Sequence, residues 1–178
     1  LNDFGRIVSV DFEFGTQPGE VPHINCMVAH ELHSGQWWKL SREQCLALGA
    51  APFPTDNRTL VVCFYATAEL NCFKVLDWPL PARVIDLFVL QRALYNGQPL
   101  SWLKPDLADQ KLGRGLNDSL IFHGLHEHVN PQKKEMQQLS AAGGPFDAAT
   151  MRTLIEYCTE DVGGTAALYQ KLAPKIGQ

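Results

Sequence analysis

The stretch Ile7-Val8-Ser9-Val10-Asp11-Phe12-Glu13-Phe14-Gly15 decides how the chain folds. Its β-branched and aromatic residues predict a β-strand, which ends at Gly15 just before the turn signal Pro18-Gly19. A strand that is apolar at nearly every position is typical of the centre of a sheet that is covered on both faces. We therefore expect this strand to lie in the middle of the fold.

Two carboxylates interrupt this apolar strand. Because side chains alternate along a strand, Asp11 and Glu13 project from the same face. The opposite face carries Val10, Phe12 and Phe14. Adjacent acids on a central strand repel each other and lose hydration, and a divalent cation such as Mg²⁺ or Mn²⁺ relieves both costs. The pattern indicates either a metal site or a strand end at which both acids reach water.

The bulk composition narrows the class of protein. The 178 residues are enough for one domain with a sizeable core, and the net charge of −4 argues against a passive electrostatic binder of nucleic acid. That charge is compatible with an enzyme whose acids are neutralised by bound metal. The apolar runs are too short to span a membrane and no signal peptide opens the chain, so we expect a cytoplasmic protein. Since the first residue is leucine, we also expect one domain of a longer protein.

The five cysteines predict free thiols. They are scattered in apolar surroundings, and no CxxC pair is present: Cys26, Cys45, Cys63, Cys72 and Cys158. Buried thiols in a reducing compartment fit this distribution better than a disulfide framework or a set of zinc ligands.

The order of the remaining elements predicts an α/β domain with a mixed sheet that takes up residues 1–178. Apolar runs predict strands over 23–31, 36–40, 60–64 and 83–87. Periodicity and capping residues predict helices over 41–48, 66–76, 88–95, 116–123, 131–140 and 147–172. The polar stretch 98–115 contains prolines and is expected to be irregular.

Two further acids stand in apolar surroundings. Glu69 is the only charged residue between Leu60 and Phe73, and it follows a strand at the start of a helix, where ligands gather in α/β sheets. An acid favoured by the helix dipole is the alternative. In the last helix Tyr157 and Asp161 are four residues apart, so they share one helical face beside the apolar stripe.

Taken in order, these motifs match a known constellation. They are Val10-Asp11-Phe12-Glu13, Tyr65-Ala66-Thr67-Ala68-Glu69 and Tyr157-Cys158-Thr159-Glu160-Asp161. The chain resembles the DEDD superfamily of 3′–5′ exonucleases, in its tyrosine-bearing (DEDDy) branch. It looks most like the proofreading exonuclease domains of family-A, DNA polymerase I-like polymerases, including phage and plasmid forms. The resemblance implies a ribonuclease H-like exonuclease fold, with a five-stranded mixed sheet and helices on both faces.

The resemblance also implies a two-metal-ion hydrolysis of phosphodiester bonds at single-stranded DNA 3′ ends, with Mg²⁺ or Mn²⁺ as the two ions. Asp11 would bridge the ions, as the first acid of the family does. Glu13 and Asp161 would complete the site of the ion that activates water, and Glu69 would serve the other ion. Tyr157 would orient the attacking water. A polymerase domain in the same parent protein and a monomeric state are also implied.

The second motif departs from the family pattern. The family places an Asp where this chain has Glu69, and an Asn where it has Tyr65. Asp86 competes for the role of the third acid, but its position corresponds to a structural Asp of the family, so we prefer Glu69.

Candidate substrate contacts are Phe12, Lys133 and Lys134. The ring of Phe12 is expected in the core, because it opposes the acids, while its backbone lies near the terminal nucleotide. Lys133 and Lys134 would bind the single strand, or they form a solvated helix face.

The spacing of His123, His126 and His128 fits no common zinc pattern, and a helix end that favours positive charge is the simpler interpretation. Trp37-Trp38 predicts one core ring and one exposed ring.

Two function classes therefore compete. The first is a metal-dependent 3′–5′ exonuclease acting on single-stranded DNA. The second is a catalytically inactive exonuclease-like module that binds nucleic acid or supports a neighbouring domain, and Glu69 is the feature that keeps it open. An RNA-directed exonuclease of the same superfamily is a third hypothesis, because the contacts that recognise a 2′-OH have no motif here.

Overall fold

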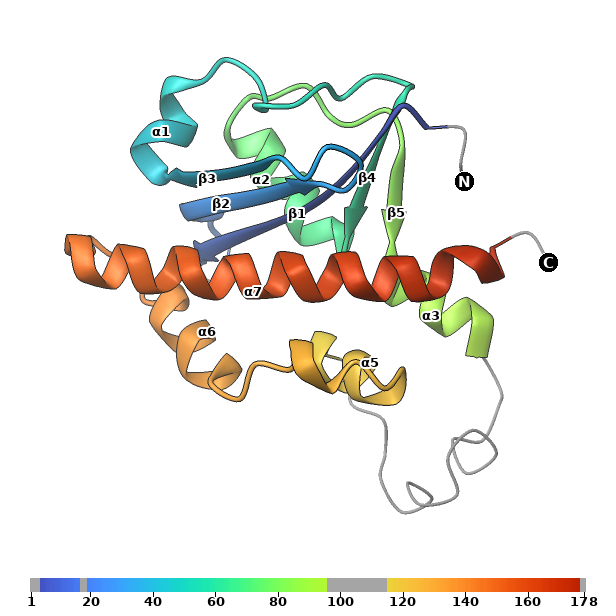
Figure 1. Cartoon of the computed structure of the whole chain (residues 1–178). Coiled ribbons are helices and arrows are strands. Elements are labelled where there is room, and N and C mark those ends of the chain that lie inside the picture. Colours follow the sequence, from blue (N-terminus) through green and yellow to red (C-terminus); the bar gives the residue numbers. More distant parts are fainter. Residues whose placement is uncertain (1–3, 17–18, 96–114, 177–178) are drawn as a thin grey trace.

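The strand that opens the chain is the middle strand of a five-stranded sheet (Figure 1). The structure is a computed structural model that describes residues 4–16, 19–95 and 115–176. The strand order is β3-β2-β1-β4-β5. The strands are β1 (Arg6–Gly15), β2 (His23–Glu31), β3 (Trp37–Ser41), β4 (Thr59–Cys63) and β5 (Val84–Asp86). Since β1 is antiparallel to β2 and parallel to β4, the sheet is mixed, as the sequence predicts.

The described helices follow the predicted order. They are α1 (Arg42–Ala47), α2 (Ala66–Val75), α3 (Leu87–Tyr95), α5 (Leu116–Phe122), α6 (Lys133–Ala141) and α7 (Ala148–Leu172). Ser41 caps α1 and accepts from the backbone N–H of Gln44, and Asp147 caps α7 and accepts from the backbone N–H of Thr150 at 2.7 Å. Residues 98–114 of the predicted irregular stretch lie outside the described residues.

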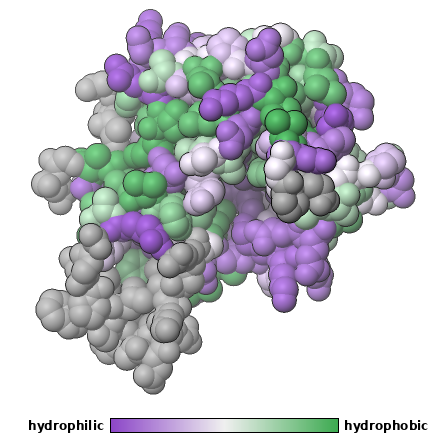
Figure 2. Space-filling model, turned by 180° about the vertical axis from the view of Figure 1, so that it is seen from behind, coloured by the Kyte–Doolittle hydropathy of each residue, from purple (hydrophilic) through white to green (hydrophobic). Residues whose placement is uncertain are grey.

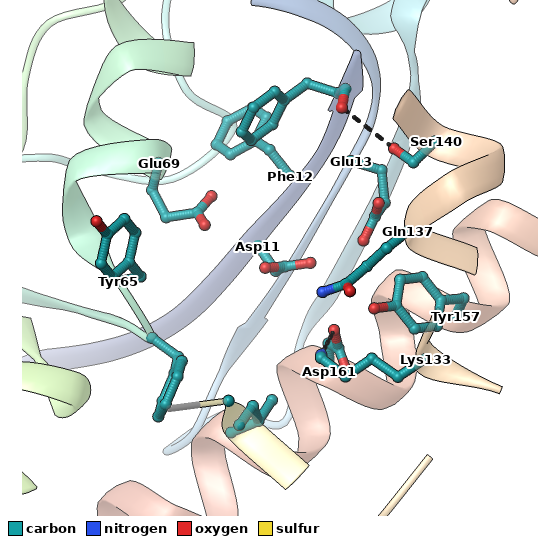
Figure 3. Close-up of a pocket in the computed structure, with 14 residues that line it drawn as sticks. Asp11, Phe12, Glu13, Tyr65, Glu69, Lys133, Gln137, Ser140, Tyr157 and Asp161 are labelled. Atoms are coloured by element: carbon teal, nitrogen blue, oxygen red, sulfur yellow. Dashed lines mark hydrogen bonds and ion pairs between the residues drawn. The ribbon is translucent and has the colours of Figure 1, made fainter. Parts of the chain in front are cut away.

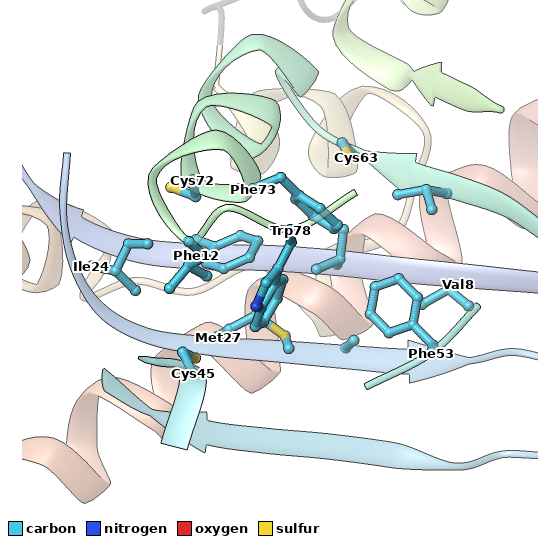
Figure 4. Close-up of a cluster of buried hydrophobic side chains, with 14 of the residues drawn as sticks. Val8, Phe12, Ile24, Met27, Cys45, Phe53, Cys63, Cys72, Phe73 and Trp78 are labelled. Carbon is cyan, nitrogen blue, oxygen red and sulfur yellow. The ribbon is translucent and has the colours of Figure 1, made fainter. Parts of the chain in front are cut away.

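One face of the sheet packs against α1 and α2. Phe12 lies in this layer, 3% exposed, with its ring centroid 5.7 Å from that of Phe73 and 6.2 Å from that of Trp78 (Figure 4). Cys45 of α1 belongs to the same cluster. The prediction that the Phe12 ring is a core residue is therefore confirmed.

The opposite face is covered by α7, which runs across the sheet (Figure 1). Cys26 and Val28 of β2 pack against Leu154, Cys158 and Val162 of this helix. A hydrogen bond from Ser9 Oγ to the carbonyl of Val162, 3.0 Å long, ties α7 to the central strand. This is the face from which Asp11 and Glu13 project, so the long helix brings its own polar side chains to theirs.

Several smaller predictions are also confirmed. All five cysteines are buried and free. Trp37 is 39% exposed and stacks on His30, whereas Trp38 packs against Phe53 in the core.

Within the described ranges, none of the helices is long and apolar enough to cross a membrane. On the face seen in Figure 2, hydrophobic and hydrophilic side chains are interspersed, and a hollow near the middle of the view is lined largely by hydrophilic ones.

Glu31 organises the turn that joins β2 to β3. Its buried carboxylate accepts hydrogen bonds from the backbone N–H groups of Ile7, His33 and Ser34, the last at 2.6 Å. Burial raises the pKa of Glu31, but the hydrogen bonds from Ser34, His33 and Ile7 outweigh it and lower the pKa to about 2. The charged form of Glu31 therefore holds the turn against the first residues of β1.

We predict that Glu31→Gln lowers the free energy of unfolding by about 1–3 kcal/mol at pH 7, since three backbone donors lose a charged acceptor. Because the folded pKa lies below the unfolded value of about 4.5, the stabilisation is complete above about pH 5 and is lost as the pH falls through 4.5 toward 2. Urea unfolding at pH 7 and at pH 3 measures both effects. A variant that is equally destabilised at both pH values would contradict the electrostatic part of this prediction.

Candidate metal centre

A pocket of about 320 Å³ lies where β1, α2, α6 and α7 converge (Figure 3). Its lining residues include four acids, a lysine and a tyrosine of α7: Asp11, Glu13, Glu69, Asp161, Lys133 and Tyr157. They come from four elements that are separated in the sequence by up to 150 residues. The structure therefore brings all four acids and the tyrosine of the three predicted motifs into one site.

Asp11 and Glu13 form the floor of the pocket on β1. Glu13 is 8% exposed and Asp11 is half-buried. Burial, together with repulsion from Asp161, raises the pKa of Asp11 to about 7. Burial and the repulsion from Asp11 raise the pKa of Glu13 to about 9. A strand end at which both acids reach water, the alternative left open by the sequence, is therefore wrong.

Glu69 reaches the site from the first turn of α2 and is only 3% exposed. The backbone N–H of Phe12 hydrogen-bonds to its carboxylate, but its Oε2 is buried and has no hydrogen-bond partner among the described residues. Burial, followed by repulsion from Asp11 and Glu13, raises the pKa of Glu69 well above its usual range. The helix dipole alone does not account for an acid that is buried against two others.

Asp86, the competing third acid, has a different task. Its carboxylate accepts hydrogen bonds from the backbone N–H groups of Tyr65 and Ala66 at the start of α2. It also accepts from Phe88 and Val89 at the start of α3. Because Asp86 caps two helices and does not line the pocket, its role is structural.

α7 supplies Tyr157 and Asp161, which are 4% and 7% exposed. Asp161 forms an ion pair with Lys133 of α6, with 2.5 Å between Nζ and Oδ2. The Lys133 ammonium also lies 5.5 Å from the ring centroid of Tyr157. Burial, then repulsion from Asp161, Glu13 and Asp11, raises the pKa of Tyr157 above its ordinary value, so the phenol is a neutral hydrogen-bond donor at physiological pH.

Cys158 is a neighbour of the site that sequence reasoning missed. Its Sγ lies 3.2 Å from Oδ2 of Asp11 and is fully buried. Ligand atoms of Asp11, Glu13 and Cys158 all lie within 4.8 Å of one another, and within the described part of the chain this is the only such group of His, Cys, Asp or Glu side chains. The sequence does place Cys158 within the motif that runs from Tyr157 to Asp161. Because a free cysteine is apolar, however, sequence reasoning predicts a core position for it.

The structure separates the remaining candidates. Lys133 lies inside the pocket, paired with an acid, whereas Lys134 is exposed on α6 and does not line the pocket. Phe12 lines the pocket, although its ring is in the core. His123, His126 and His128 do not converge as metal ligands.

The donor set suits a hard divalent cation. Four carboxylates in a small, largely buried pocket offer the oxygen ligands that Mg²⁺ and Mn²⁺ prefer. The unpartnered Oε2 of Glu69 and the mutual repulsion of the acids are costs that bound cations would remove. Among the described residues that line the pocket, Lys133 carries the only ammonium, and one positive charge cannot balance four carboxylates. The residues present therefore fit a metal centre.

The raised pKa values predict how stability depends on pH in chelator. Asp11 and Glu13 release their protons at a higher pH in the folded state than in the unfolded state. Between about pH 4 and pH 9 the folded state therefore binds more protons than the unfolded state. Stability therefore falls as the pH rises through this window. We expect Asp11→Asn to raise the melting temperature at pH 8 by several degrees and to have little effect at pH 4.

Thermal unfolding in EDTA at pH 4, 6 and 8 measures this effect. Glu156→Gln is the matched control, because Glu156 is exposed on α7 and should leave the pH profile unchanged. A lower melting temperature for Asp11→Asn than for the unsubstituted protein at pH 8 would show that the carboxylates do not repel each other as inferred.

Comparison with models of protein families finds none that matches the chain, and comparison with curated proteins finds no match either. The chemistry of the site is therefore inferred from the residues that converge on it.

Proposed function

We propose that the chain is a metal-dependent 3′–5′ exonuclease that hydrolyses phosphodiester bonds at the 3′ ends of single-stranded DNA. One observation carries this proposal: Asp11, Glu13, Glu69 and Asp161 reach one pocket from three elements, and Tyr157 stands beside them. The acids repel one another in a site that excludes much of the water, and this arrangement is costly unless cations bind there. The five-stranded mixed sheet is compatible with the proposed ribonuclease H-like exonuclease fold.

The four acids would hold two divalent cations, Mg²⁺ or Mn²⁺. When bound, such a pair supplies an activated water and neutralises charge on the attacking and leaving oxygens. Asp11, at the centre of the group, would be shared between the two sites. Glu13 and Asp161 would hold the cation on the side of α7, and Glu69 the cation on the side of α2.

Tyr157 and Lys133 would assist without holding metal. A neutral Tyr157 donates a hydrogen bond and so orients the attacking water, while its raised pKa excludes it as a general base at neutral pH. Lys133 pairs with Asp161 in this structure. If Asp161 held a cation, the Lys133 ammonium would be free to pair with a phosphate of the substrate.

The proposed substrate is a single strand with a free 3′ end, with DNA ahead of RNA. Proofreading beside a polymerase domain of the same parent protein, as a monomer, is the proposed context. The five buried free thiols agree with a reducing compartment such as the bacterial cytoplasm.

An inactive exonuclease-like module is the second candidate, and the Lys133–Asp161 ion pair favours it. This pair satisfies one of the four acids without a metal ion. A module that binds nucleic acid without cleaving it would keep this pair permanently, so the two candidates differ in whether cations displace the ammonium.

The decisive assay is degradation of a 5′-labelled single-stranded DNA with Mg²⁺ or Mn²⁺, with the matching RNA alongside. We expect a ladder of products shortened from the 3′ end. EDTA should abolish it, and Asp11→Asn should reduce its rate by more than about 100-fold, since the shared ligand loses its charge. A folded protein that degrades neither polymer would favour the inactive module. A strong preference for RNA would support the RNA-directed alternative.

Metal binding can be measured independently of cleavage. Calorimetric titration with Mn²⁺ should give two ions per chain, and each ion present at about 100 times its dissociation constant should stabilise the fold by about 2.7 kcal/mol. Glu69→Gln should bind one ion fewer and remain folded, because it removes a carboxylate ligand without changing the shape of the buried side chain. Glu156→Gln serves as the exposed control. Stoichiometry that is unchanged in Glu69→Gln would remove Glu69 from the proposed ligand set.

A further inference from the structure

Tyr65 holds a backbone conformation that tyrosine rarely adopts. It stands directly before α2 with φ 76° and ψ 59°, in the left-handed region. This conformation costs a residue with a Cβ about 1–2 kcal/mol, whereas glycine adopts it freely. Such strain persists where the surroundings enforce it, and it clusters at functional sites.

The enforcing group is Asp86. Its carboxylate accepts from the backbone N–H of Tyr65 at 3.2 Å and from that of Ala66 at 2.9 Å. Because the same carboxylate caps α3 through Phe88, the strained residue is tied to two helices at once. The backbone of Tyr65 is therefore set before any ligand arrives.

The side chain of Tyr65 forms an aromatic wall of the pocket. Its ring meets Phe88 edge to face, with 5.3 Å between the centroids, and Phe88 in turn meets Phe64 at 6.0 Å. The Arg92 guanidinium lies 4.5 Å from the centroid of Phe88. Tyr65 is nonetheless 53% exposed, so a large part of the ring is unused by the fold. Figure 3 shows it on the α2 side of the pocket, across from Tyr157 and Lys133.

The pocket thus offers two kinds of surface, a group of acids and an exposed aromatic ring. Three of the acids that would hold cations, and through them a phosphate, lie on β1 and α7, and the fourth, Glu69, lies on α2. The exposed ring of Tyr65 stands at the α2 edge of the pocket, across from Tyr157 and Lys133. A nucleotide has these same two parts, an anionic phosphate and a flat base. Stacking on an aromatic ring is worth about 1–3 kcal/mol for any base, so it needs no sequence preference.

We propose that Tyr65 is the stacking surface for the base of the 3′-terminal nucleotide, and that Asp86 fixes the orientation of its ring. This inference rests on the proposed exonuclease function. Tyr65 stands at the position at which the resembled motif carries Asn. The proposed stacking on Tyr65 is therefore specific to this chain and is not implied by the motif. Tyr65 binds substrate, and Asp86 acts through it as a positioning residue.

Two substrates test the proposal: single-stranded DNA with an ordinary 3′-terminal nucleotide, and the same strand ending in an abasic tetrahydrofuran residue. The unsubstituted protein should cleave the ordinary end about 10-fold faster or more, measured as kcat/KM. Tyr65→Ala should lose that factor on the ordinary end and leave the abasic end unchanged. Tyr65→Phe should behave like the unsubstituted protein.

Controls separate stacking from folding. Tyr65→Gly relieves the left-handed strain and removes the ring, so it should remain folded and repeat the result of Tyr65→Ala. Trp37→Ala removes another exposed ring, on β3 and outside the pocket lining, and should keep the full preference for the ordinary end. If Tyr65→Ala and Tyr65→Gly keep this preference, or slow both ends equally, the proposal is overturned.

A binding assay distinguishes failure of this proposal from failure of the proposed function. A strand with 2-aminopurine at its 3′ end, titrated with protein in Ca²⁺, loses fluorescence when the base stacks. Quenching by the unsubstituted protein and Tyr65→Phe, but not by Tyr65→Ala, supports stacking even if no cleavage occurs. Binding without quenching by the unsubstituted protein overturns it, even if the chain proves to be an exonuclease.

Discussion

Repulsion among buried carboxylates is the constraint on which the structure of the site depends. Asp11 and Glu13 project from a strand that is covered on both faces, so water cannot screen them fully. Glu69 and Asp161 add two more charges from helices on either side. Burial, followed by mutual repulsion, raises the pKa values of the three acids on β1 and α2, and bound cations would relieve both effects.

The scaffold offsets this cost with contacts that are independent of the site. Phe12 and its neighbours fill the layer under α2, and the apolar stripe of α7 packs against β2 on the other face. Hence β1 presents its acids from a rigid position. Within the pocket, Lys133 compensates one acid, while the buried oxygen of Glu69 has no partner among the described residues. Stability and the proposed metal binding therefore make opposing demands on this pocket.

A carboxylate also maintains the backbone strain at the edge of the pocket. The Asp86 carboxylate accepts four hydrogen bonds from backbone N–H groups at the starts of α2 and α3, and thereby holds Tyr65 in a left-handed conformation. A capping carboxylate that looked like a candidate metal ligand is instead the support of an aromatic ring. Glu69, which follows β4, thus lines the pocket, whereas Asp86, the last residue of β5, supports the backbone beside it.

The sequence by itself determined the elements and the face that each acid occupies. Alternation places Asp11 and Glu13 opposite Phe12, and a four-residue spacing places Tyr157 with Asp161, because these relations depend on local geometry alone. It also located the helix and strand bounds to within about two residues, because caps and apolar runs are local signals. Only the tertiary structure decided which long-range neighbours meet: Lys133 with Asp161, Cys158 with Asp11, and Asp86 with the backbone of Tyr65. Those pairs join residues 21 to 147 positions apart, and no local pattern records a contact that forms only when helices dock on a sheet.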